Sequence, residues 1–310
     1  MKIVFMGTPS FAVPVLEELI KNYEVTLVVT QPDKEVGRKR ILTPSPIKEV
    51  ALKNNIKVFQ PTKIREDYQE VLDANPDIII TAAYGQIIPK ILLDYPKYKC
   101  VNVHASLLPK YRGGAPIHHA IINGDEYAGV TIMYMAEKMD DGDIISQDKL
   151  LVGENNTTQL TERLSALGAN LLMDTLPNIF SGNINPIAQN DCEVTFAYNI
   201  SKEDEKIIFN NTCIMVYNQI RGLADNPGGY ALYKDKKFKI YASSFEYSDI
   251  SGEVGEIVDT NKRLGIKVKN GVIYPLTIQL EGKNKMSIKD FYNGMPNYFK
   301  LGEIIKYMEE

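Results

Sequence analysis

The chain has 310 residues, of which 44% are hydrophobic and 24% charged, a composition typical of folded globular proteins rather than disordered or fibrous ones. A formal net charge of −4 gives no overall basic signature for a nucleic-acid partner. The three cysteines lie far apart and form no CxxC pair. Neither a disulfide framework nor a zinc site is therefore expected, and reduced thiols in the cytoplasm are the default.

Short apolar segments alternate with helical ones through the first hundred residues. Strands are predicted at 2–6, 25–30, 58–59, 77–82 and 100–104, and helices at 10–21, 47–54, 65–74 and 86–93. This alternation predicts an α/β fold with a doubly wound, mostly parallel sheet that is covered on both faces. The first apolar run is short and is interpreted as a strand rather than a signal peptide. No run is long enough to span a bilayer, so no membrane partner is expected.

A polar loop at residues 31–46 separates the second predicted strand from the next helix and carries the basic cluster Arg38, Lys39 and Arg40. Runs of charge are usually a solvated surface. The length of this loop would also let the cluster become ordered on an anionic partner, and from the residues alone both interpretations stay open.

The stretch from Cys100 to Gly124 combines a strand, a loop rich in proline and glycine, and a helix. Alternation along the strand places Asn102 and His104 on one face and Val101 and Val103 on the other. An amide and an imidazole at the carboxyl end of a strand lie where open α/β sheets place their chemistry. Because burying such a pair without partners would be costly, we predict a functional role for both residues.

An acidic turn at residues 139–143 is the second candidate. Its carboxylates belong to Asp140, Asp141 and Asp143. The alternative is a solvated turn. Three carboxylates could bind a cation, but the chain lacks a partner cluster of ligands, and two of its three histidines are adjacent on a predicted helix. We therefore expect no metal. A carboxylate here could instead orient His104 or favour its charged form.

Two further patterns are weaker. Ser106 lies in no GxSxG elbow and has no base behind it, so it is interpreted as a hydrogen-bonding loop residue rather than a nucleophile. Gly7 follows the first strand, but the sequence GTPSFA is not GxGxxG, so a nicotinamide dinucleotide site is not predicted.

The second half of the chain changes in character. Strands at 129–135 and 144–147 precede a long amphipathic helix at 157–179 and an aperiodic, Asn-rich segment. A helix at about 203–222 is then followed by five short strands, which suggest a small β-barrel of the oligonucleotide-binding type. We predict a catalytic domain at 1–180, a linker at 181–202 and a barrel domain at 203–310.

Several segments together resemble the folate-dependent formyltransferases, and the resemblance covers essentially the full length. The most specific segment is NVHASLLPKYRGGAPI at 102–117. The others are MGTPSFA at 6–12, QPDKEVGRKRILTPSPIK at 31–48, AYGQIIP at 83–89, YNISKEDEKI at 198–207 and KMSIKDFYNG at 285–294.

The resemblance implies transfer of a formyl group from 10-formyltetrahydrofolate to the α-amino group of methionine on initiator tRNA, for translation initiation in the cytoplasm. It implies that Asn102, His104 and Asp140 are catalytic. The folate-binding residues that it implies are Ser106, Leu107, Leu108, Pro109, Tyr84, Gly85 and Ile87. It implies tRNA binding by Arg38, Lys39 and Arg40 and by the barrel domain, with no metal.

Two departures from the family pattern matter. The acidic motif is shortened to Asp140-Asp141-Gly142-Asp143, where spacing selects Asp140 but leaves Asp141 as a possible substitute. The chain also has no tryptophan, although one is often found in this family near the position of Asn226.

The residues leave other functions open. The acceptor could be glycinamide ribonucleotide or an amino sugar nucleotide, or the protein could hydrolyse 10-formyltetrahydrofolate. A non-catalytic RNA-binding protein is the alternative from a different class. The basic loop and the extra domain favour the tRNA substrate, and we expect a monomer.

Overall fold

The computed structural model describes residues 1–37 and 40–306. The chain divides into two compact units. Unit 1 comprises residues 1–116, 127–151 and 161–198, and unit 2 comprises residues 117–126, 152–160 and 199–310. Within the described residues, no helix is both long and apolar enough to cross a membrane.

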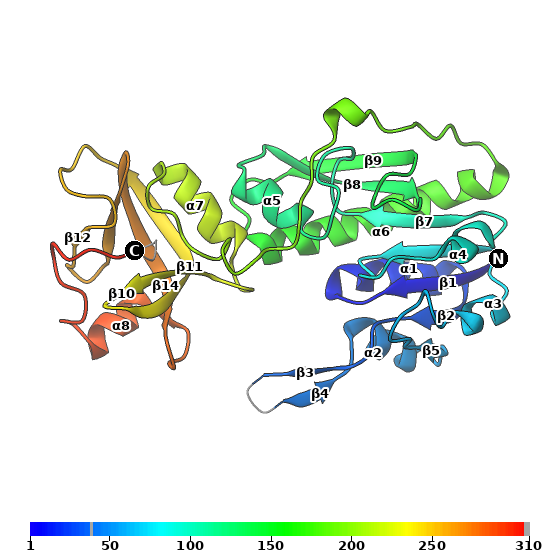
Figure 1. The fold of residues 1–310 in the computed structure, drawn as a ribbon, viewed down its shortest axis with the longest axis horizontal. Helices are drawn as coiled ribbons and strands as arrows, with labels where there is room; N and C mark the ends of the chain where they lie inside the picture. Colours follow the sequence, from blue (N-terminus) through cyan, green and yellow to red (C-terminus); the bar gives the residue numbers. More distant parts are fainter. Residues whose placement is uncertain (38–39, 307–310) are drawn as a thin grey trace. The chain divides into compact units, whose positions relative to one another are not determined.

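Unit 1 contains a seven-stranded sheet in the order β5-β2-β1-β6-β7-β8-β9 (Figure 1). The strands are β1 (Lys2–Gly7), β2 (Glu24–Val29), β5 (Val58–Phe59), β6 (Ile78–Ala82), β7 (Cys100–His104), β8 (Tyr127–Tyr134) and β9 (Ile144–Leu151). The first five of these strands run parallel, whereas β8 is antiparallel to β7 and β9 is antiparallel to β8. The predicted mostly parallel α/β sheet is confirmed.

Helices cover this sheet because its central strands are apolar on both faces. Every residue of β6 is buried, and so are all residues of β1 after Lys2. The helices are α1 (Val13–Asn22), α2 (Pro46–Lys53), α3 (Gln69–Asp73), α4 (Lys90–Asp94) and α6 (Thr157–Ser181). In α6, a Cβ on Gly168 would lie 2.9 Å from Val103 Cγ1 and 3.2 Å from Val130 Cγ1. The helix therefore packs on the face of β7 opposite Asn102 and His104.

The order of the strands reverses between β1 and β6, since the chain proceeds from β1 to β2 and β5 on one side and from β6 to β7 on the other. Hydrogen bonds join the loops that follow these strands. Thr8 Oγ1 and Gln31 Nε2 both donate to the carbonyl oxygen of Tyr84, at 3.1 and 3.0 Å. Open α/β sheets bind ligands outside the carboxyl ends of the strands at such a reversal.

Unit 2 is an antiparallel β structure with its own core. Its strands are β10 (Gly229–Tyr233), β11 (Lys236–Tyr247), β12 (Ile257–Asp259), β13 (Gly265–Val268), β14 (Gly271–Leu280) and β15 (Met286–Ser287). Its helices are α7 (Cys213–Gly222), α8 (Ile288–Gly294) and nearly all of α5 (Pro116–Ile122). The residues near the end of the described chain pair with both outer strands. Lys306 bridges Leu232 of β10, and Ile304 bridges Glu256 next to β12. This pairing closes the sheet as a barrel requires, and the predicted antiparallel domain is confirmed.

The helix predicted over 203–222 is wrong in its first half, because α7 begins only at Cys213. The preceding segment pairs with β10: the N–H of Ile207 donates to the carbonyl of Tyr230, and the N–H of Tyr230 donates to the carbonyl of Glu205. Ile207 and Phe209 are fully buried in this extended conformation. Burial against the barrel core thus outweighs local helix propensity.

Three other predicted elements are also corrected. Helix α3 begins at Gln69 rather than 65, and α4 begins at Lys90 rather than 86, following Pro89 in an extended conformation. Residues that precede a proline disfavour helical dihedrals, which explains the late start of α4. The loop predicted at 31–46 contains a hairpin of β3 (Lys34–Val36) and β4 (Ile41–Thr43). Arg38 and Lys39, which come between these two strands in the sequence, lie outside the described residues.

Candidate active site

Asn102 lies on β7 beside Thr81 of β6, its neighbour in the parallel register. Thr81 Oγ1 donates a hydrogen bond to Asn102 Oδ1 at 2.8 Å. This bond fixes the orientation of the amide, because a hydroxyl that donates here requires the carbonyl oxygen to face it. The two N–H bonds of Nδ2 therefore point away from Thr81, and no described residue accepts from them.

His104 ends the same strand and is only 5% exposed. Its Nε2 lies 3.0 Å from the carbonyl oxygen of Tyr111. A carbonyl can only accept, so Nε2 carries a proton and donates it. The other ring nitrogen, Nδ1, lies 3.7 Å from Asp140 Oδ1, which is close enough for charge interaction but too long for a hydrogen bond.

Asp140 is held in place by backbone contacts on both sides. The N–H of Gly113 donates to Asp140 Oδ2 at 2.8 Å, which leaves Oδ1 facing the imidazole. Gln189 Nε2 donates to the carbonyl oxygens of Asp140 and Gly142, at 2.7 and 2.8 Å. Asp140 has a φ of 52°, an uncommon conformation for a residue with a side chain, and this network holds it there.

Asp141 takes a different partner from Asp140. Its Oδ1 lies 2.5 Å from Nη1 of Arg112, and Arg112 Nε donates to Gln189 Oε1 at 3.0 Å. The Arg112 side chain is buried, and its Nη2 has no hydrogen-bond partner among the described residues. The two aspartates are therefore separated: Asp140 faces the imidazole and Asp141 faces the guanidinium.

The loop after β7 is stabilised from within. Ser106 is buried, and its hydroxyl donates to the carbonyl of Lys110 at 2.6 Å, so it forms a loop hydrogen bond as predicted. Thr131 Oγ1 donates to the Ser106 carbonyl at 2.6 Å and accepts from the Leu108 N–H at 3.1 Å. Gln147 Nε2 donates to the Leu108 carbonyl at 2.9 Å. These bonds give Leu107, Leu108 and Pro109 a defined backbone beside His104.

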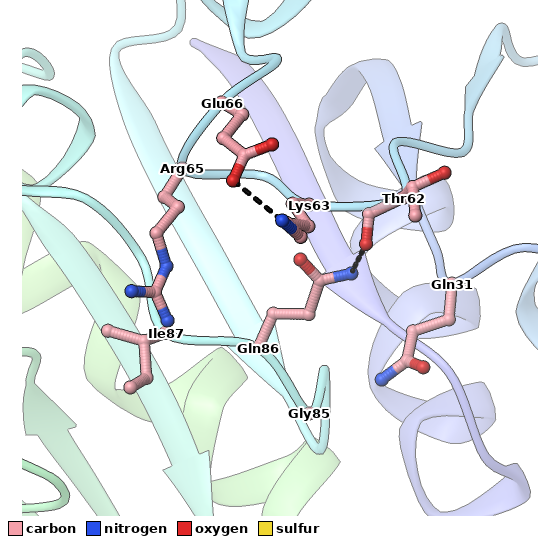
Figure 2. Close-up of a pocket in the computed structure, with 8 residues that line it drawn as sticks. All are labelled: Gln31, Thr62, Lys63, Arg65, Glu66, Gly85, Gln86 and Ile87. Atoms are coloured by element: carbon pink, nitrogen blue, oxygen red, sulfur yellow. Dashed lines mark hydrogen bonds and ion pairs between the residues drawn. The ribbon is translucent and has the colours of Figure 1, made fainter.

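A pocket of about 600 Å³ lies beside the loop that follows β6 (Figure 2). Its lining residues are Gln31, Thr62, Lys63, Arg65, Glu66, Gly85, Gln86 and Ile87. Gly85 and Ile87 are two of the predicted folate-binding residues, and the side chain of Ile87 is 66% exposed. Figure 2 shows the Lys63–Glu66 ion pair, at 2.8 Å, and draws no bond from Arg65 to the other lining residues.

Tyr84, the third predicted folate residue of this loop, lies in the core next to the pocket. It is 4% exposed, and its hydroxyl has no hydrogen-bond partner among the described residues. Burial raises the pKa of Tyr84 far above its ordinary value. Its carbonyl oxygen, by contrast, accepts from both Thr8 and Gln31.

Of the predicted tRNA-binding cluster, the structure describes Arg40. Arg40 follows the tip of the β3–β4 hairpin with a φ of 48°, and its Nε lies 3.8 Å from Glu35 Oε2 across the hairpin. Both side chains are exposed, and such pairs contribute little to stability. In the part of the chain that the structure describes, no cluster of three or more His, Cys, Asp or Glu side chains could hold a metal.

Sequence reasoning missed three residues of this site: Thr81, Arg112 and Gln189. Arg112 belongs to the signature segment, which is the signal that could have found it. Thr81 and Gln189 carry no local signal, because their partners are distant in the sequence. Thr81 is 21 residues from Asn102, and Gln189 is 49 residues from Asp140.

The sequence matches two family models. Residues 1–176 match the model described as formyl transferase, and residues 199–296 match the model of the formyl transferase C-terminal domain. The chain belongs to the formyl transferase family, as the resemblance of its motifs indicated.

Within that family, its curated relatives include methionyl-tRNA formyltransferases. That of Listeria innocua is 51% identical over 94% of this chain and 95% of its own length. That of Staphylococcus aureus is 46% identical over 96% of this chain and 97% of its own length.

Solved structures with a similar fold are more distant in sequence. The sugar 3N-formyl transferase WlaRD, solved in the presence of dTDP and 5-N-formyl-THF, has a TM-score of 0.67 at 21% identity, covering 92% of this chain and 99% of its own. HypX from Aquifex aeolicus, in complex with tetrahydrofolic acid, has a TM-score of 0.64 at 16% identity, covering all of this chain and 51% of its own. These likenesses support the fold alone.

Proposed function

We propose that this protein transfers a formyl group from 10-formyltetrahydrofolate to the α-amino group of methionine on initiator tRNA. The observation that carries the proposal is the match to methionyl-tRNA formyltransferases, 51% identical over nearly the full length of both chains. The relatives match both units, so the proposal does not depend on the sheet domain alone. Formyltransferases for a nucleotide or a sugar, and a folate hydrolase, are not favoured.

Asn102 fits the role of an oxyanion donor. In the reaction the amine attacks the formyl carbon, a C–N bond forms, and negative charge develops on the formyl oxygen. A donor aimed at that oxygen stabilises the transition state more than the ground state. Thr81 holds the amide so that its Nδ2 hydrogens remain available, which is the orientation that this role needs.

His104 would supply the second hydrogen-bond donor to the formyl oxygen, and Asp140 would act as the base. To donate to the formyl oxygen, His104 would carry a proton on Nδ1 as well as on Nε2, with Oδ1 of Asp140 3.7 Å from Nδ1. Since Nε2 is occupied by Tyr111, we assign the contact with the oxyanion to Nδ1. Asp140 Oδ1 would accept the proton that the amine loses, directly or through water, and the bond from the formyl carbon to N10 of the folate then breaks as N10 regains a proton.

The predicted folate residues fit a pterin with a charged tail. The loop of Leu107, Leu108 and Pro109 offers an ordered backbone beside His104, and the exposed Ile87 offers an apolar wall. The buried hydroxyl of Tyr84 has no hydrogen-bond partner among the described residues. If the loop moves, a bound ligand could supply one. The pocket beside Gly85 and Arg65 suits the carboxylates of the folate glutamate. The bound donor supplies the activated formyl group.

We further propose that the tRNA is bound by the hairpin residues Arg38, Lys39 and Arg40 and by unit 2. The catalytic domain would comprise residues 1–180, the linker 181–202 and the tRNA-binding domain 203–310. We expect the protein to act as a monomer in the cytoplasm, where initiator tRNA is charged.

A single assay tests the proposal. Purified protein is incubated with 10-formyltetrahydrofolate and charged initiator tRNA, and the methionine released from the tRNA is analysed. We expect formylmethionine, and no formylation of glycinamide ribonucleotide or of an amino sugar nucleotide in parallel reactions. Formate released at the same rate without tRNA would instead indicate a hydrolase and contradict the proposal.

A further inference from the structure

Two exposed aromatic rings stack on each other at the end of unit 1. The rings of Phe196 and Tyr198 are parallel to within 4°, and their centroids are 5.6 Å apart. Phe196 is 48% exposed and Tyr198 is 65% exposed. Two exposed aromatic rings that stack on each other present flat faces on which a further planar group can stack.

The pair results from an extended segment with alternating sides. Ala197, between the two rings, is fully buried, and its N–H and carbonyl both pair with the loop after β7. Because successive side chains of an extended segment point to opposite faces, burial of Ala197 forces Phe196 and Tyr198 outward on the same face. The pairing also fixes the backbone that carries the rings, so little flexibility would be lost on binding.

This segment is directly joined to the proposed active site. The N–H of Arg112 donates to the Thr195 carbonyl at 2.9 Å, and the N–H of Ala197 donates to the Arg112 carbonyl at 2.8 Å. The preceding residue, Tyr111, donates its N–H to Thr195 Oγ1 at 2.9 Å and accepts from His104 Nε2 at 3.0 Å. The aromatic pair is thus one backbone pairing away from the residue that contacts His104.

A basic residue in the loop that pairs with this segment favours a nucleotide over an apolar ligand. Lys110 is exposed and precedes Tyr111 in the same loop, and Pro109 accepts from the Thr195 N–H at 3.4 Å. Proteins bind single-stranded nucleic acid by combining aromatic rings, on which bases stack, with cations that attract phosphate.

We propose that Phe196 and Tyr198 form a stacking platform for the terminal nucleobase of the tRNA acceptor strand, with Lys110 near its phosphates. This inference rests on the proposed function. The methionyl group is esterified to the ribose of the terminal nucleotide, so the base lies one sugar away from the amine that is formylated. Stacking that base would place the amine beside His104 without any contact to the methionine side chain.

The direct test uses initiator tRNA whose terminal adenine is replaced by 2-aminopurine, a base whose fluorescence falls when it stacks on an aromatic ring. Saturating wild-type protein should quench the fluorescence, and Phe196→Leu should quench it much less. Phe196→Tyr should behave like wild type. Equal quenching by wild type and Phe196→Leu would overturn the proposal.

Kinetics provide an independent measurement. For charged initiator tRNA, Phe196→Leu should raise KM by roughly 5- to 100-fold, the range that one base–aromatic stack contributes, with little change in kcat. The matched control is Tyr95→Leu, which removes an exposed tyrosine of unit 1 far from this loop in sequence and should leave KM unchanged. A fall in kcat at constant KM would indicate a structural role for Phe196 and contradict the platform.

The two proposals can fail separately. The fluorescence change requires binding and not turnover, so it would still be seen if the protein formylated a different acceptor on a tRNA. Quenching without formylmethionine would refute the proposed function alone, and formylmethionine without a difference between wild type and Phe196→Leu would refute the platform alone.

Discussion

Asp140 and Asp141 are neighbours in sequence but face different groups. Asp140 accepts from the Gly113 N–H and presents Oδ1 to His104, whereas Asp141 forms an ion pair with the buried Arg112. The spacing of the shortened acidic motif favoured Asp140 but left Asp141 open. The geometry makes Asp140 the candidate base and Asp141 a residue that supports the loop through Arg112.

Substitution of each aspartate should therefore give a different defect. Asp140→Asn should lower kcat by roughly 10²-fold or more, because it removes both the proton acceptor and the charge beside His104. Asp141→Asn should keep most of kcat but lower the free energy of unfolding by roughly 1.5–3 kcal/mol, since the Arg112 guanidinium loses its charged partner. Initial rates and urea unfolding would measure the two effects. The reverse pattern would assign the catalytic role to Asp141.

A second prediction concerns protonation of His118 on α5 in unit 2. Burial lowers the pKa of His118 from its ordinary value of 6.5, a hydrogen bond to the Asn226 backbone opposes this shift, and the neighbouring His119 adds to it. The folded protein then binds fewer protons than the unfolded chain just below pH 6.5, so this residue makes stability fall as the pH falls through that range.

His118→Gln should remove this contribution. The difference in unfolding free energy between wild type and variant should change by at most about 1.4 kcal/mol per pH unit between pH 7 and the lowered pKa, and should be constant above pH 7. Urea unfolding at a series of pH values would measure it. A difference that is independent of pH would show that His118 does not titrate on unfolding.

At the scale of elements, the basic cluster of residues 38–40 falls between β3 and β4 in the sequence, and β4 exposes Ile41 and Leu42. Replacement of Arg38, Lys39 and Arg40 by alanine should raise the KM for tRNA and make the salt dependence of binding less steep. The log–log slope should decrease by about 0.9 for each phosphate that the variant no longer neutralises. Titrations of tRNA at several salt concentrations would measure the slope.

The matched control for this variant neutralises the exposed Lys53, Lys57 and Lys97. An equal change in both variants would show that the basic cluster is merely solvated.

Elements with a strong local pattern could be predicted from the sequence. Continuous apolar runs indicated β1, β6 and β7, and period-two alternation placed Asn102 and His104 on one face. The hairpin could not be predicted, because its strands have three residues each and its register is set by pairing alone. The extended segment before α7 was predicted as helix because its burial depends on pairing with β10. That pairing joins Glu205 to Tyr230, 25 residues further along the chain.

The same reasoning limits what could be predicted of the site. Residues within the signature segment were found, since motif and spacing are both local. Thr81 and Gln189 were not found, because they act through long-range hydrogen bonds to Asn102 and to the Asp140 backbone. Their contribution becomes visible only once the sheet and the segment after α6 are brought together.

At the scale of the whole molecule, the sheet of unit 1 would carry the chemistry, and a hairpin, an aromatic pair and the barrel of unit 2 would bind RNA. Formyl transfer should then be separable from tRNA binding. Residues of the sheet edge should change the chemical step, and residues of the other surfaces should change KM and salt dependence.

The most direct measurement is single-turnover formylation of charged initiator tRNA by saturating enzyme loaded with 10-formyltetrahydrofolate. It compares wild type with Asn102→Ala and His104→Ala, and tRNA binding is measured alongside. We expect each variant to slow formation of formylmethionine by about 10²–10³-fold, the loss typical of one oxyanion donor, with tRNA affinity nearly unchanged. Wild-type rates in both variants would contradict the assignment of catalysis to this edge of the sheet.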